Sequence, residues 1–522
     1  MSGLAELLTV LALNVRHFLL IEDVRMTSLT RADWEQRAKT LKIEGRAFVH
    51  GAYRAAASGE TFECISPVDG RLLAMVASCD LADAELAVQD ARQAFDSGVW
   101  SRMAPVARKE VMIRFADLIE QHAEELALLE TLDMGKPISD SLNIDVSSAS
   151  RSIRWSGEAI DKIYDEVAAT PHNELGLVTR EPIGVVAAIV PWNFPLLMSC
   201  WKLGPALSTG NSVILKPSEK SPLTAIRLAQ LAIDAGIPAG VFNVLPGFGH
   251  TVGKALALHM DVDTLVFTGS TKIAKQLMIY AGESNMKRVW LEAGGKSPNI
   301  VFADAPDLQA AAEAAASAIA FNQGEVCTAG SRLLVENSIK AQFVPMVVEA
   351  IKAWKPGNPL DPQTTVGALV DTTQMNNVLS YIQAGHDDGA KLVAGGKRVM
   401  EETGGTYVEP TIFDGVSNAM RIAQEEIFGP VLSVIGFDSA QEAVAIANDT
   451  VYGLAAAVWT SNLSKAHLTA KALRAGSVWV NQYDGGDMTA PFGGFKQSGN
   501  GRDKSLHAFD KYTELKATWI KL

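Results

Sequence analysis

One of the four cysteines lies where a thiol could act as a nucleophile. Cys327 follows Gly324 and an alanine-rich helical pattern over 308–320, so we expect it on a loop just beyond a helix. A thiol in such a place can reach solvent, and its thiolate would attack an electrophilic carbon. For the remaining cysteines we expect the usual fate of the residue, which is a buried and unreactive thiol; they are Cys64, Cys79 and Cys200.

Glu292 and Asn193 are polar residues with which such a thiol could work. Glu292 follows the apolar run 289–291, so its carboxylate would be partly desolvated and its pKa raised toward neutrality, as a general base requires. Asn193 follows the apolar run 185–190, at the expected carboxyl end of a strand. Its amide N–H, with the backbone N–H of Cys327, could donate to an oxyanion. The plainer alternatives are a carboxylate that caps a turn and an asparagine that simply makes one.

A glycine-rich turn at 247–253 could hold phosphate groups. Gly247, Gly249 and Gly253 surround the start of an expected helix, where backbone N–H groups and the helix N-terminus bind pyrophosphate. The spacing departs by one residue from the dinucleotide fingerprint Gly-x-Gly-x-x-Gly. The turn by itself is therefore a weak indication of a nucleotide site.

The segments around these residues alternate between strands and helices. The continuous apolar run 184–190 is typical of a strand that is buried on both faces. Further strands are expected at 212–215, 241–245 and 264–267, and helices at 222–234, 251–259 and 272–281. This alternation predicts a doubly wound parallel sheet, in which ligands bind beyond the carboxyl ends of the strands.

Helical patterns precede this sheet, and a second α/β unit follows it. Apolar residues recur at helical spacing over 105–116 and 123–132. The second unit is expected to begin near Gly294, with Pro306 in the first turn of its first helix. The last residues, 513–522, alternate between apolar and polar and predict a terminal strand that could pair with a partner subunit.

Composition narrows the classes of function. A chain of 522 residues with 48% hydrophobic and 20% charged residues predicts two or three globular domains. The formal net charge of −13, without a Lys/Arg stripe, argues against nucleic-acid binding. The cysteines are widely spaced, with no Cys-x-x-Cys and no Cys/His cluster. We therefore expect no disulfide framework, no metal site and a cytoplasmic protein without a membrane span.

The first 25 residues are unusual. The run 4–21 is apolar but contains Glu6, Arg16 and His17, which makes it a poor membrane span, and it lacks the flanks of a signal peptide. Met26 is followed by sequence that resembles an ordinary N-terminus. Our hypothesis is that Met26 is the true start, or that residues 1–25 form a loosely attached extension.

Seven segments, in the order found here, resemble the aldehyde dehydrogenase superfamily over the chain from about Asp33 onward. They are PWNFP at 191–195, KPSE at 216–219, FTGS at 267–270, LEAGGK at 291–296, GEVC at 324–327, EEIFGP at 425–430 and PFGG at 491–494. Each is weak alone, but together and in this order they are highly specific. The resemblance implies an α/β fold with three parts: a Rossmann-like NAD-binding domain (26–160 and 183–294), an α/β catalytic domain (295–495) and a small β oligomerisation arm (161–182 and 500–522). It also implies a homodimer or homotetramer.

The resemblance implies a cysteine-based oxidation. Cys327 would add to the aldehyde carbon, Asn193 would stabilise the oxyanion, and hydride would pass to NAD. Glu292 would then activate water to hydrolyse the thioester, and Lys202 would support Glu292 and its proton exit. Many family members have a bulkier residue than Ala293 after this glutamate. The presence of a base argues for water, not coenzyme A, as the acyl acceptor.

The resemblance also assigns residues to the cofactor. These residues are Trp192, Lys216, Glu219, Gly249, Gly253, Thr268, Gly269, Ser270, Glu426 and Phe428. Glu219 would accept hydrogen bonds from a ribose 2′-OH and repel a 2′-phosphate, which favours NAD. Lys216 beside it weakens that preference and leaves NADP open as an alternative.

The substrate residues point to an amine-bearing aldehyde. The apolar wall of the family's aldehyde tunnel is matched by Phe194, Leu197, Trp201 and Phe492. In the segment 481–490, Gly485 and Gly486 leave room where relatives often place an aromatic, and Asp484 and Asp487 would attract a cationic tail. The segment resembles the branch that acts on polyamine-derived aminoaldehydes, including γ-glutamyl-γ-aminobutyraldehyde and 4-guanidinobutyraldehyde.

Several alternatives stay open at this point. The acids at 484 and 487 could belong to an ordinary solvated loop. The substrate could be betaine aldehyde, succinic semialdehyde or a generic aliphatic aldehyde. From a different class, the chain could be a cofactor-binding structural protein that has lost catalysis.

Overall fold

The computed structural model describes residues 29–522, which form two compact units. Unit 1 contains the described residues up to Glu35 together with Gly294–Asp487 and Gly494–Ser498, and unit 2 contains Gln36–Ala293, Met488–Gly493 and Gly499–Leu522. The hypothesis about Met26 and residues 1–25 lies outside the described residues. From residue 29 onward, no helix is long and apolar enough to cross a membrane.

Unit 2 is built on a seven-stranded sheet with the strand order β11-β10-β7-β8-β9-β1-β2. Its strands are β1 (Ala47–Val49), β2 (Ala52–Arg54), β7 (Val185–Ile189), β8 (Ser212–Lys216), β9 (Phe242–Val244), β10 (Thr264–Gly269) and β11 (Arg288–Ala293). The five strands from β11 to β9 are parallel, which confirms the predicted doubly wound sheet. The short β1 and β2 add an antiparallel edge.

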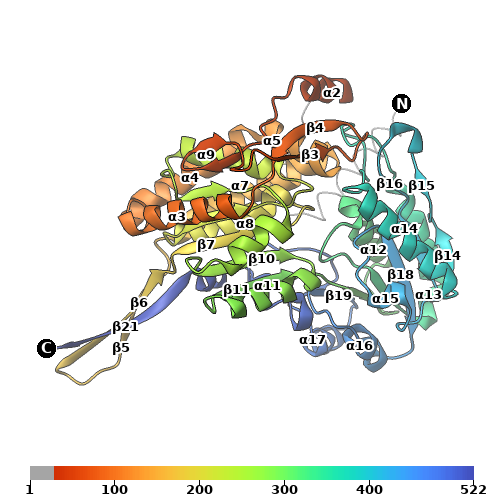
Figure 1. Cartoon of the computed structure of the whole chain (residues 1–522). Helices are drawn as coiled ribbons and strands as arrows, with labels where there is room; N and C mark the ends of the chain where they lie inside the picture. Colours follow the sequence, from red (N-terminus) through yellow and green to blue (C-terminus); the bar gives the residue numbers. More distant parts are fainter. Residues whose placement is uncertain (1–28) are drawn as a thin grey trace. The chain divides into compact units, whose positions relative to one another are not determined.

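Helices cover both faces of this sheet, as the ribbon shows (Figure 1). The first layer consists of α3 (Leu81–Ser97), α10 (Lys254–Leu258) and α11 (Thr271–Glu283). The second layer includes α4 (Pro105–Gln121), α5 (Ala123–Met134), α7 (Ser147–Ala159), α8 (Pro195–Ser208) and α9 (Leu223–Ala235). Val185 and Ala187 of β7 pack with α3, because successive strand side chains point to opposite faces. Gly236, with a φ of 102°, ends α9 where the sequence predicted a helix end.

Short elements complete the main body of unit 2. They are α2 (Arg31–Thr40), which begins in unit 1, the antiparallel pair β3 (Thr61–Ile65) and β4 (Leu72–Ala77), α6 (Ile138–Asp140), the π-helical turns η1 (Ser141–Val146) and η2 (Gly249–Gly253), and the 3-10 helix η7 (Leu506–Lys511). The helix expected over 251–259 is thus divided between η2 and α10.

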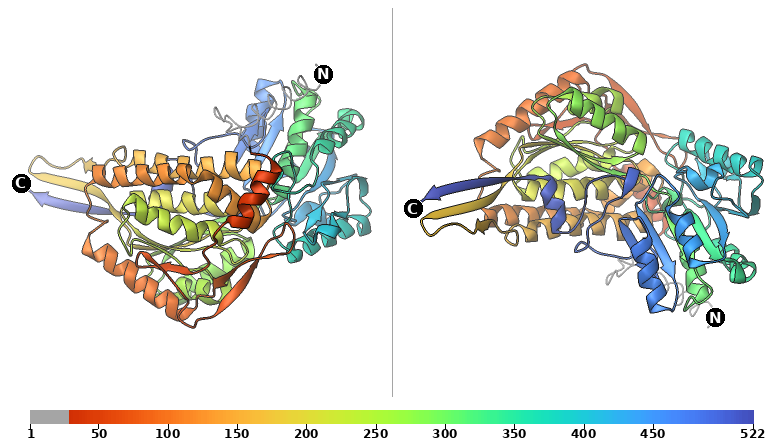
Figure 2. Two further views of the ribbon diagram at one scale, coloured as in Figure 1. Left: turned by 90° about the horizontal axis from the view of Figure 1, so that it is seen from above. Right: turned by 90° about the horizontal axis from the view of Figure 1, so that it is seen from below.

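A three-stranded antiparallel sheet extends from unit 2 as an arm (Figures 1 and 2). It consists of β5 (Glu166–Ala168), β6 (Glu174–Pro182) and β21 (Thr513–Lys521). The predicted terminal strand is confirmed, and within the chain it pairs along its whole length with β6. The arm exposes large apolar side chains, among them Leu515 (61% exposed) and Trp519 (65% exposed).

Unit 1 is a second α/β unit, as predicted, with the strand order β14-β17-β18-β13-β12-β19-β20. Its strands are β12 (Pro298–Val301), β13 (Arg332–Glu336), β14 (Lys391–Ala394), β17 (Thr411–Asp414), β18 (Val431–Phe437), β19 (Ala455–Trp459) and β20 (Ser477–Val480). All adjacent pairs are parallel except β14 with β17 at one edge. Its longer helices are α12 (Leu308–Ala320), α13 (Asn337–Ala350), α14 (Thr372–Asp387), α16 (Ala440–Asn448) and α17 (Leu463–Ala472).

The remaining elements of unit 1 are short. They are the hairpin β15 (Arg398–Val399) and β16 (Tyr407–Val408), α15 (Arg421–Gln424), and the 3-10 helices η3 (Phe321–Gly324), η4 (Ile351–Ala353), η5 (Glu401–Thr403) and η6 (Lys496–Ser498). The helix α12 has the bounds predicted from its alanine-rich pattern. The placement of Pro306 in its first turn was wrong: Asp307 is the N-cap and its Oδ1 accepts from Ala310 N at 2.9 Å, so Pro306 precedes the cap.

Candidate active site

Cys327 lies on the loop that follows α12 and η3, as the sequence predicted, and its side chain is half-buried. The preceding backbone is unusual, since Asn322 and Gln323 both have positive φ angles, of 47° and 56°. Two buried side chains hold this backbone: Gln323 Oε1 accepts from Gly367 N at 2.9 Å and Glu325 Oε1 accepts from Val370 N at 3.0 Å. The loop that carries the thiol is therefore fixed on both sides of Gly324.

The Cys327 loop and Glu426 both pack against the Gly294-Gly295 pair. A Cβ at Gly295 would lie 2.4 Å from the backbone oxygen of Cys327, and a Cβ at Gly294 would lie 1.9 Å from Glu426 Oε2. Gly295 N also donates to Glu426 Oε1 at 2.9 Å. Gly295 needs glycine because its obstacle is backbone, whereas at Gly294 the obstacle is the end of the Glu426 side chain, which would have to move.

Glu426 and Phe428 lie on the segment between α15 and β18. Burial raises the pKa of the Glu426 carboxyl to about 7, although the Gly295 N–H and Lys296 act in the opposite direction. Phe428 has a φ of 55°, and its backbone oxygen accepts from Gln374 Nε2 at 2.7 Å. A Cβ at Gly324 would lie 2.3 Å from the carbonyl carbon of Gly429, so this segment also packs on the Cys327 loop.

Of the two acids proposed for a cationic substrate, the structure brings Asp484 to the Cys327 loop. Thr328, the residue after Cys327, donates from Oγ1 to Asp484 Oδ1 at 3.4 Å. The buried Tyr483 hydroxyl donates to the backbone oxygen of Thr328 at 2.6 Å, and burial raises its pKa well above the ordinary value. Asp487 is exposed.

In unit 2, the predicted residues gather at the carboxyl edge of the parallel sheet. Strand register aligns Ile189 of β7 with Lys216 of β8 and with Phe267 of β10, and it aligns Thr268 with Glu292 of β11. Trp192 and Asn193 follow the end of β7, while Gly269 ends β10 and Ser270 follows it. This is the edge at which ligands of doubly wound sheets bind.

Asn193 is 4% exposed and lies two residues before Pro195, where α8 begins. The start of α8 rests on buried polar groups: Leu196 N donates to Glu130 Oε2 at 3.3 Å, and Lys136 Nζ lies 3.9 Å from the centroid of the Phe194 ring. Lys136 also pairs with Asp145 on η1 and, at 3.5 Å, with Glu130. These contacts fix the turn that carries Asn193.

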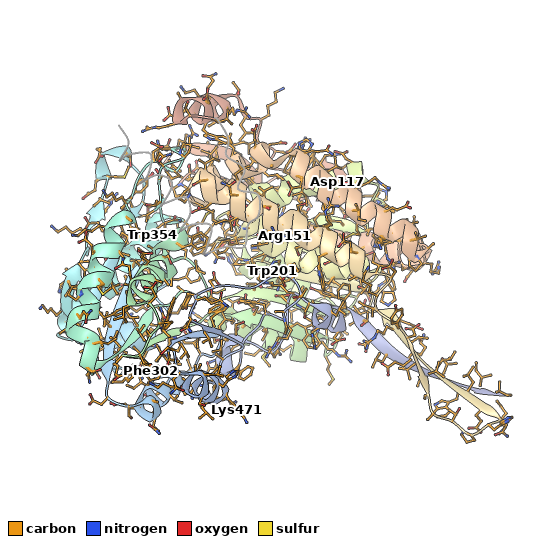
Figure 3. All side chains as sticks on the ribbon, turned by 180° about the vertical axis from the view of Figure 1, so that it is seen from behind. Asp117, Arg151, Trp201, Phe302, Trp354 and Lys471 are labelled. Atoms are coloured by element: carbon orange, nitrogen blue, oxygen red, sulfur yellow. The ribbon has the colours of Figure 1, made fainter. Side chains whose placement is uncertain are left out.

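The apolar residues predicted for the aldehyde tunnel are Phe194, which precedes α8, Leu197 and Trp201 on α8, and Phe492 on the 488–493 segment. Phe194 and Leu197 are each 9% exposed, and the rings of Trp201 and Phe492 lie 5.2 Å apart at 63°. Figure 3 labels Trp201 on α8, Arg151 on α7 and Asp117 on α4, three helices that contact one another. Trp201 and Phe492 thus form one aromatic pair.

Several residues of unit 2 fit a nucleotide. Thr268 Oγ1 is buried and makes no hydrogen bond within residues 29–522. Lys216 Nζ lies 3.1 Å from Glu219 Oε2, and the Glu219 side chain is 35% exposed and could meet a ribose, whereas the Lys216 side chain is 3% exposed. Gly249 lies in open space, where a Cβ would meet no atom within 4 Å, and Gly253 follows at the end of η2. The unpaired hydroxyl and the open glycine turn are the features that a bound dinucleotide would occupy.

Ser270 and Trp192 have further contacts of their own. The Ser270 hydroxyl oxygen accepts from Ile273 N at 3.4 Å and caps α11. The backbone oxygen of Trp192 accepts from Ser221 Oγ at 3.0 Å, and Lys220 Nζ lies 5.5 Å from the centroid of its ring.

Glu292 lies near the end of β11 and is 4% exposed. Lys202, predicted as its support, pairs with Asp503 at 2.5 Å, and Lys511 binds the other oxygen of the same carboxylate. Sequence reasoning missed Lys511, because nothing in its local sequence indicates a buried charge. Its partners Lys202 and Asp503 lie on other elements and are brought to it by the fold.

The other cysteines are buried, as predicted. Burial raises the pKa of Cys64, Cys79 and Cys200 above the ordinary range of a thiol. All four cysteines are free. Within residues 29–522, no group of histidine, cysteine, aspartate and glutamate side chains could hold a metal ion.

Known proteins resemble the chain over nearly its whole length. An NADP/NAD-dependent aldehyde dehydrogenase, PuuC from Escherichia coli, is 57% identical over 94% of this chain and 98% of its own. Indole-3-acetaldehyde dehydrogenase AldA from P. syringae, solved in complex with NAD+, is 84% identical, covers 95% of this chain and 100% of its own, and has a TM-score of 0.94. A γ-glutamyl-γ-aminobutyraldehyde dehydrogenase structure from Burkholderia cenocepacia is 63% identical with the same coverage and a TM-score of 0.93. Residues 53–518 match the family described as the aldehyde dehydrogenase family, and the chain therefore belongs to that family.

Proposed function

We propose that this enzyme oxidises an amine-bearing aldehyde to its carboxylate, with NAD as the hydride acceptor. The observation that carries the proposal is the position of Asp484, whose carboxylate accepts from Thr328, the neighbour of Cys327. An acid held beside the nucleophile loop would attract and orient a cationic tail. Asp487 would add to the negative potential.

Cys327 is the proposed nucleophile. Its thiolate would add to the aldehyde carbon, and the Asn193 amide would donate to the oxyanion that forms. The fixed turn before α8 suits this role, since a donor held in place needs no reorganisation during the reaction. Bound NAD supplies the acceptor for the hydride that leaves the tetrahedral adduct.

Glu292 is the proposed general base for hydrolysis of the thioester. It would take a proton from water, and the water oxygen would attack the acyl carbon while the Cys327 thiolate leaves. Lys202 would assist by supporting Glu292 and its proton exit. In this scheme the cysteine is restored and the product is a carboxylate.

For the cofactor, we propose that the parallel sheet of unit 2 is the NAD-binding domain and that unit 1 supplies the catalytic cysteine. The residues that would hold NAD are Trp192, Lys216, Glu219, Gly249, Gly253, Thr268, Gly269 and Ser270, with Glu426 and Phe428 at the nicotinamide ribose and ring. Glu219 favours a free 2′-OH, and Lys216 leaves room for some use of NADP.

A neutral aromatic aldehyde is the second candidate substrate. The Trp201–Phe492 pair offers two apolar rings, inclined at 63°, against which an aromatic ring could pack, and the P. syringae relative is named for indole-3-acetaldehyde. The two candidates differ in charge, so a change at Asp484 separates them.

The test compares kcat/KM for 4-guanidinobutyraldehyde, γ-glutamyl-γ-aminobutyraldehyde, betaine aldehyde, succinic semialdehyde and indole-3-acetaldehyde. We expect Asp484→Asn to lower kcat/KM for the cationic aldehydes by about 10-fold while leaving indole-3-acetaldehyde within about 2-fold. Asp487→Asn removes an exposed acid three residues further along and should lower kcat/KM for the cationic aldehydes by less than Asp484→Asn does. Equal effects of Asp484→Asn on charged and neutral aldehydes would refute the role of Asp484.

We also propose that the arm of β5, β6 and β21 joins subunits into a dimer or tetramer of a cytoplasmic enzyme. The apolar side chains of Val167, Leu515 and Trp519 are 69%, 61% and 65% exposed, and exposed apolar patches are typical of protein–protein contacts. Light scattering of the full chain and of a chain that ends at Tyr512 tests this: the shortened chain should lose its assembly, and an unchanged mass would refute it.

A further inference from the structure

A buried cluster of three charges lies in unit 2 on elements far apart in the chain. Asp503 Oδ2 accepts from Lys202 Nζ at 2.5 Å, and Asp503 Oδ1 accepts from Lys511 Nζ. Lys202 lies on α8 and Lys511 on η7, and all three side chains are at most 3% exposed. We call Lys202, Asp503 and Lys511 the lysine clamp.

The lysine clamp is tied to the strand that carries Glu292. Asn500 N donates to Leu291 O at 3.0 Å, and Asn500 Oδ1 accepts from Leu291 N at 2.9 Å. Glu292 pairs as an isolated antiparallel bridge with Gly499, whose φ is 123° and whose Cβ would lie 2.0 Å from Leu291 O. Asp503 is therefore four residues from a backbone contact of Glu292.

The other side of Asp503 is tied to the proposed substrate wall. Asp503 N donates to Phe492 O at 2.6 Å, and Phe492 N donates to Asp503 O at 2.7 Å. The Phe492 ring in turn packs on Trp201, next in sequence to Lys202. The same short segment thus joins the aromatic wall, the lysine clamp and the strand of Glu292.

The charges of the clamp do not balance by themselves. Two ammonium groups and one carboxylate leave a net charge of +1 where water is almost excluded, and an excess buried charge is costly unless it is paired. Burial lowers the pKa of Lys511 to about 8, against the attraction of Asp503 and of Glu292, while Lys202 lowers it further. Lys511 Nζ donates to the Asp503 carboxylate, the contact that an ammonium group makes. A Glu292 carboxylate would neutralise the excess.

We propose that Lys511 is a positioning residue of the general base, and that its positive charge favours the carboxylate form of Glu292 that accepts a proton from water. This inference rests on the proposed function, in which Glu292 activates the hydrolytic water. The titratable groups that face Lys511 are Asp503, Lys202, Glu292 and the adjacent Tyr512, whose ring centroid lies 5.4 Å from Lys511 Nζ. Without the ammonium of Lys511, the protonated form of Glu292 becomes easier to reach and its pKa rises.

The experiment is the pH profile of kcat in the full-length enzyme, between pH 5.5 and pH 9.5. Lys511→Met removes the charge and keeps most of the side-chain volume, and its acidic limb should move to higher pH by about 0.5–1 unit. That shift is a loss of roughly 3–10-fold in kcat on the acidic limb that fades toward pH 9. Lys511→Arg should keep the wild-type limb. Lys162→Met, at an exposed lysine paired with Asp161, is the matched control and should keep it too.

A second variant tests the same charge argument and can be measured even if Lys511→Met alone does not fold. Asp503→Asn/Lys511→Met removes one charge of each sign and leaves Lys202, so the net charge stays at +1 and the limb should stay within about 0.3 unit of wild type. A Lys511→Met profile that superposes on wild type, or that falls equally at every pH, overturns the proposal. So does a double variant whose limb moves by a full unit.

Glu292→Gln distinguishes this inference from the proposed function. If Glu292→Gln still turns over aldehyde at the wild-type rate, Glu292 is not the base and the proposed hydrolysis is wrong. If Glu292→Gln accumulates acyl-enzyme while the Lys511→Met limb does not move, the proposed function stands and the role of Lys511 alone is refuted. Binding of NAD, followed by quenching of tryptophan fluorescence, serves as the check that each variant is folded.

Discussion

Gly295→Ala is a change of one methyl group that should disable the nucleophile loop. The added Cβ would lie 2.4 Å from the Cys327 backbone oxygen, whereas ordinary contact begins at 3.4 Å, so the carbonyl would have to retreat by about 1 Å. The obstacle is backbone, and the loop behind it is held by Gln323 and Glu325, so it cannot move freely. A displacement of about 1 Å at a reacting group costs on the order of 100-fold in rate, or roughly 2.7 kcal/mol.

The assay for Gly295→Ala is steady-state NADH formation at saturating aldehyde and NAD, together with the rate at which iodoacetamide labels Cys327. We expect kcat to fall by about 100-fold and the labelling rate to change, while NAD binding through unit 2 persists. Gly282→Ala on α11 is the matched control, because a Cβ there meets no atom within 4 Å, and it should leave kcat unchanged. A folded Gly295→Ala enzyme with kcat within 3-fold of wild type would refute the assignment of this close contact to the catalytic loop.

Three further outcomes are expected. Gly294→Ala would place a Cβ 1.9 Å from the present position of Glu426 Oε2, and the Glu426 side chain would have to rotate away. We therefore expect the KM for NAD to rise by about 10-fold with a smaller change in kcat, and an unchanged KM would contradict this. Glu426→Gln should stabilise the protein relative to wild type at pH 8 but not at pH 5, by on the order of 1–3 kcal/mol in chemical unfolding. The reason is that the folded pKa of about 7 exceeds the ordinary 4.5, so wild type loses stability as pH rises between those values, and an equal difference at both pH values would disprove it. Lys136→Met should lower the free energy of unfolding by about 3–5 kcal/mol, because it leaves the buried Glu130 and Asp145 without their cation. Lys109→Met, which removes the partner of an exposed acid, should lower it by under about 1 kcal/mol. Similar losses for the two variants would count against the buried network.

The family, the enzyme class and the α/β fold could be read from the sequence, because they depend on local signals. The alanine-rich pattern gave α12 its bounds, and the continuous apolar run placed β7. Side-chain periodicity and turn residues act over a few positions, so they can be recognised without knowledge of the tertiary structure. The position of Pro306 was wrong because Asp307, one residue later, offers the better cap.

The sequence predicted in part that the proposed site residues of unit 2 lie together at one edge of its parallel sheet. Strand–helix alternation predicts that residues after β7, β8, β10 and β11 share one edge, and the register of Thr268 with Glu292 agrees with this. The roles of Cys327, Glu292, Asn193 and the cofactor residues remain predictions that the variants above test. The loop geometry behind them, with positive φ at Asn322 and Gln323, had no sequence signal.

Cys327 on its loop, the motifs of the family and the alternation of strands and helices were determined by the sequence alone. Only the tertiary structure decided that Asp484 lies beside Thr328, 156 residues away, and that Asp503 joins Lys202, 301 residues away, to Lys511. The physical reason is that each of these contacts joins two separate elements, and the local sequence pattern of each element is compatible with many tertiary arrangements. Only one arrangement buries the apolar faces of the sheet and its helices together, and that arrangement brings the charged side chains at the sheet edge into contact.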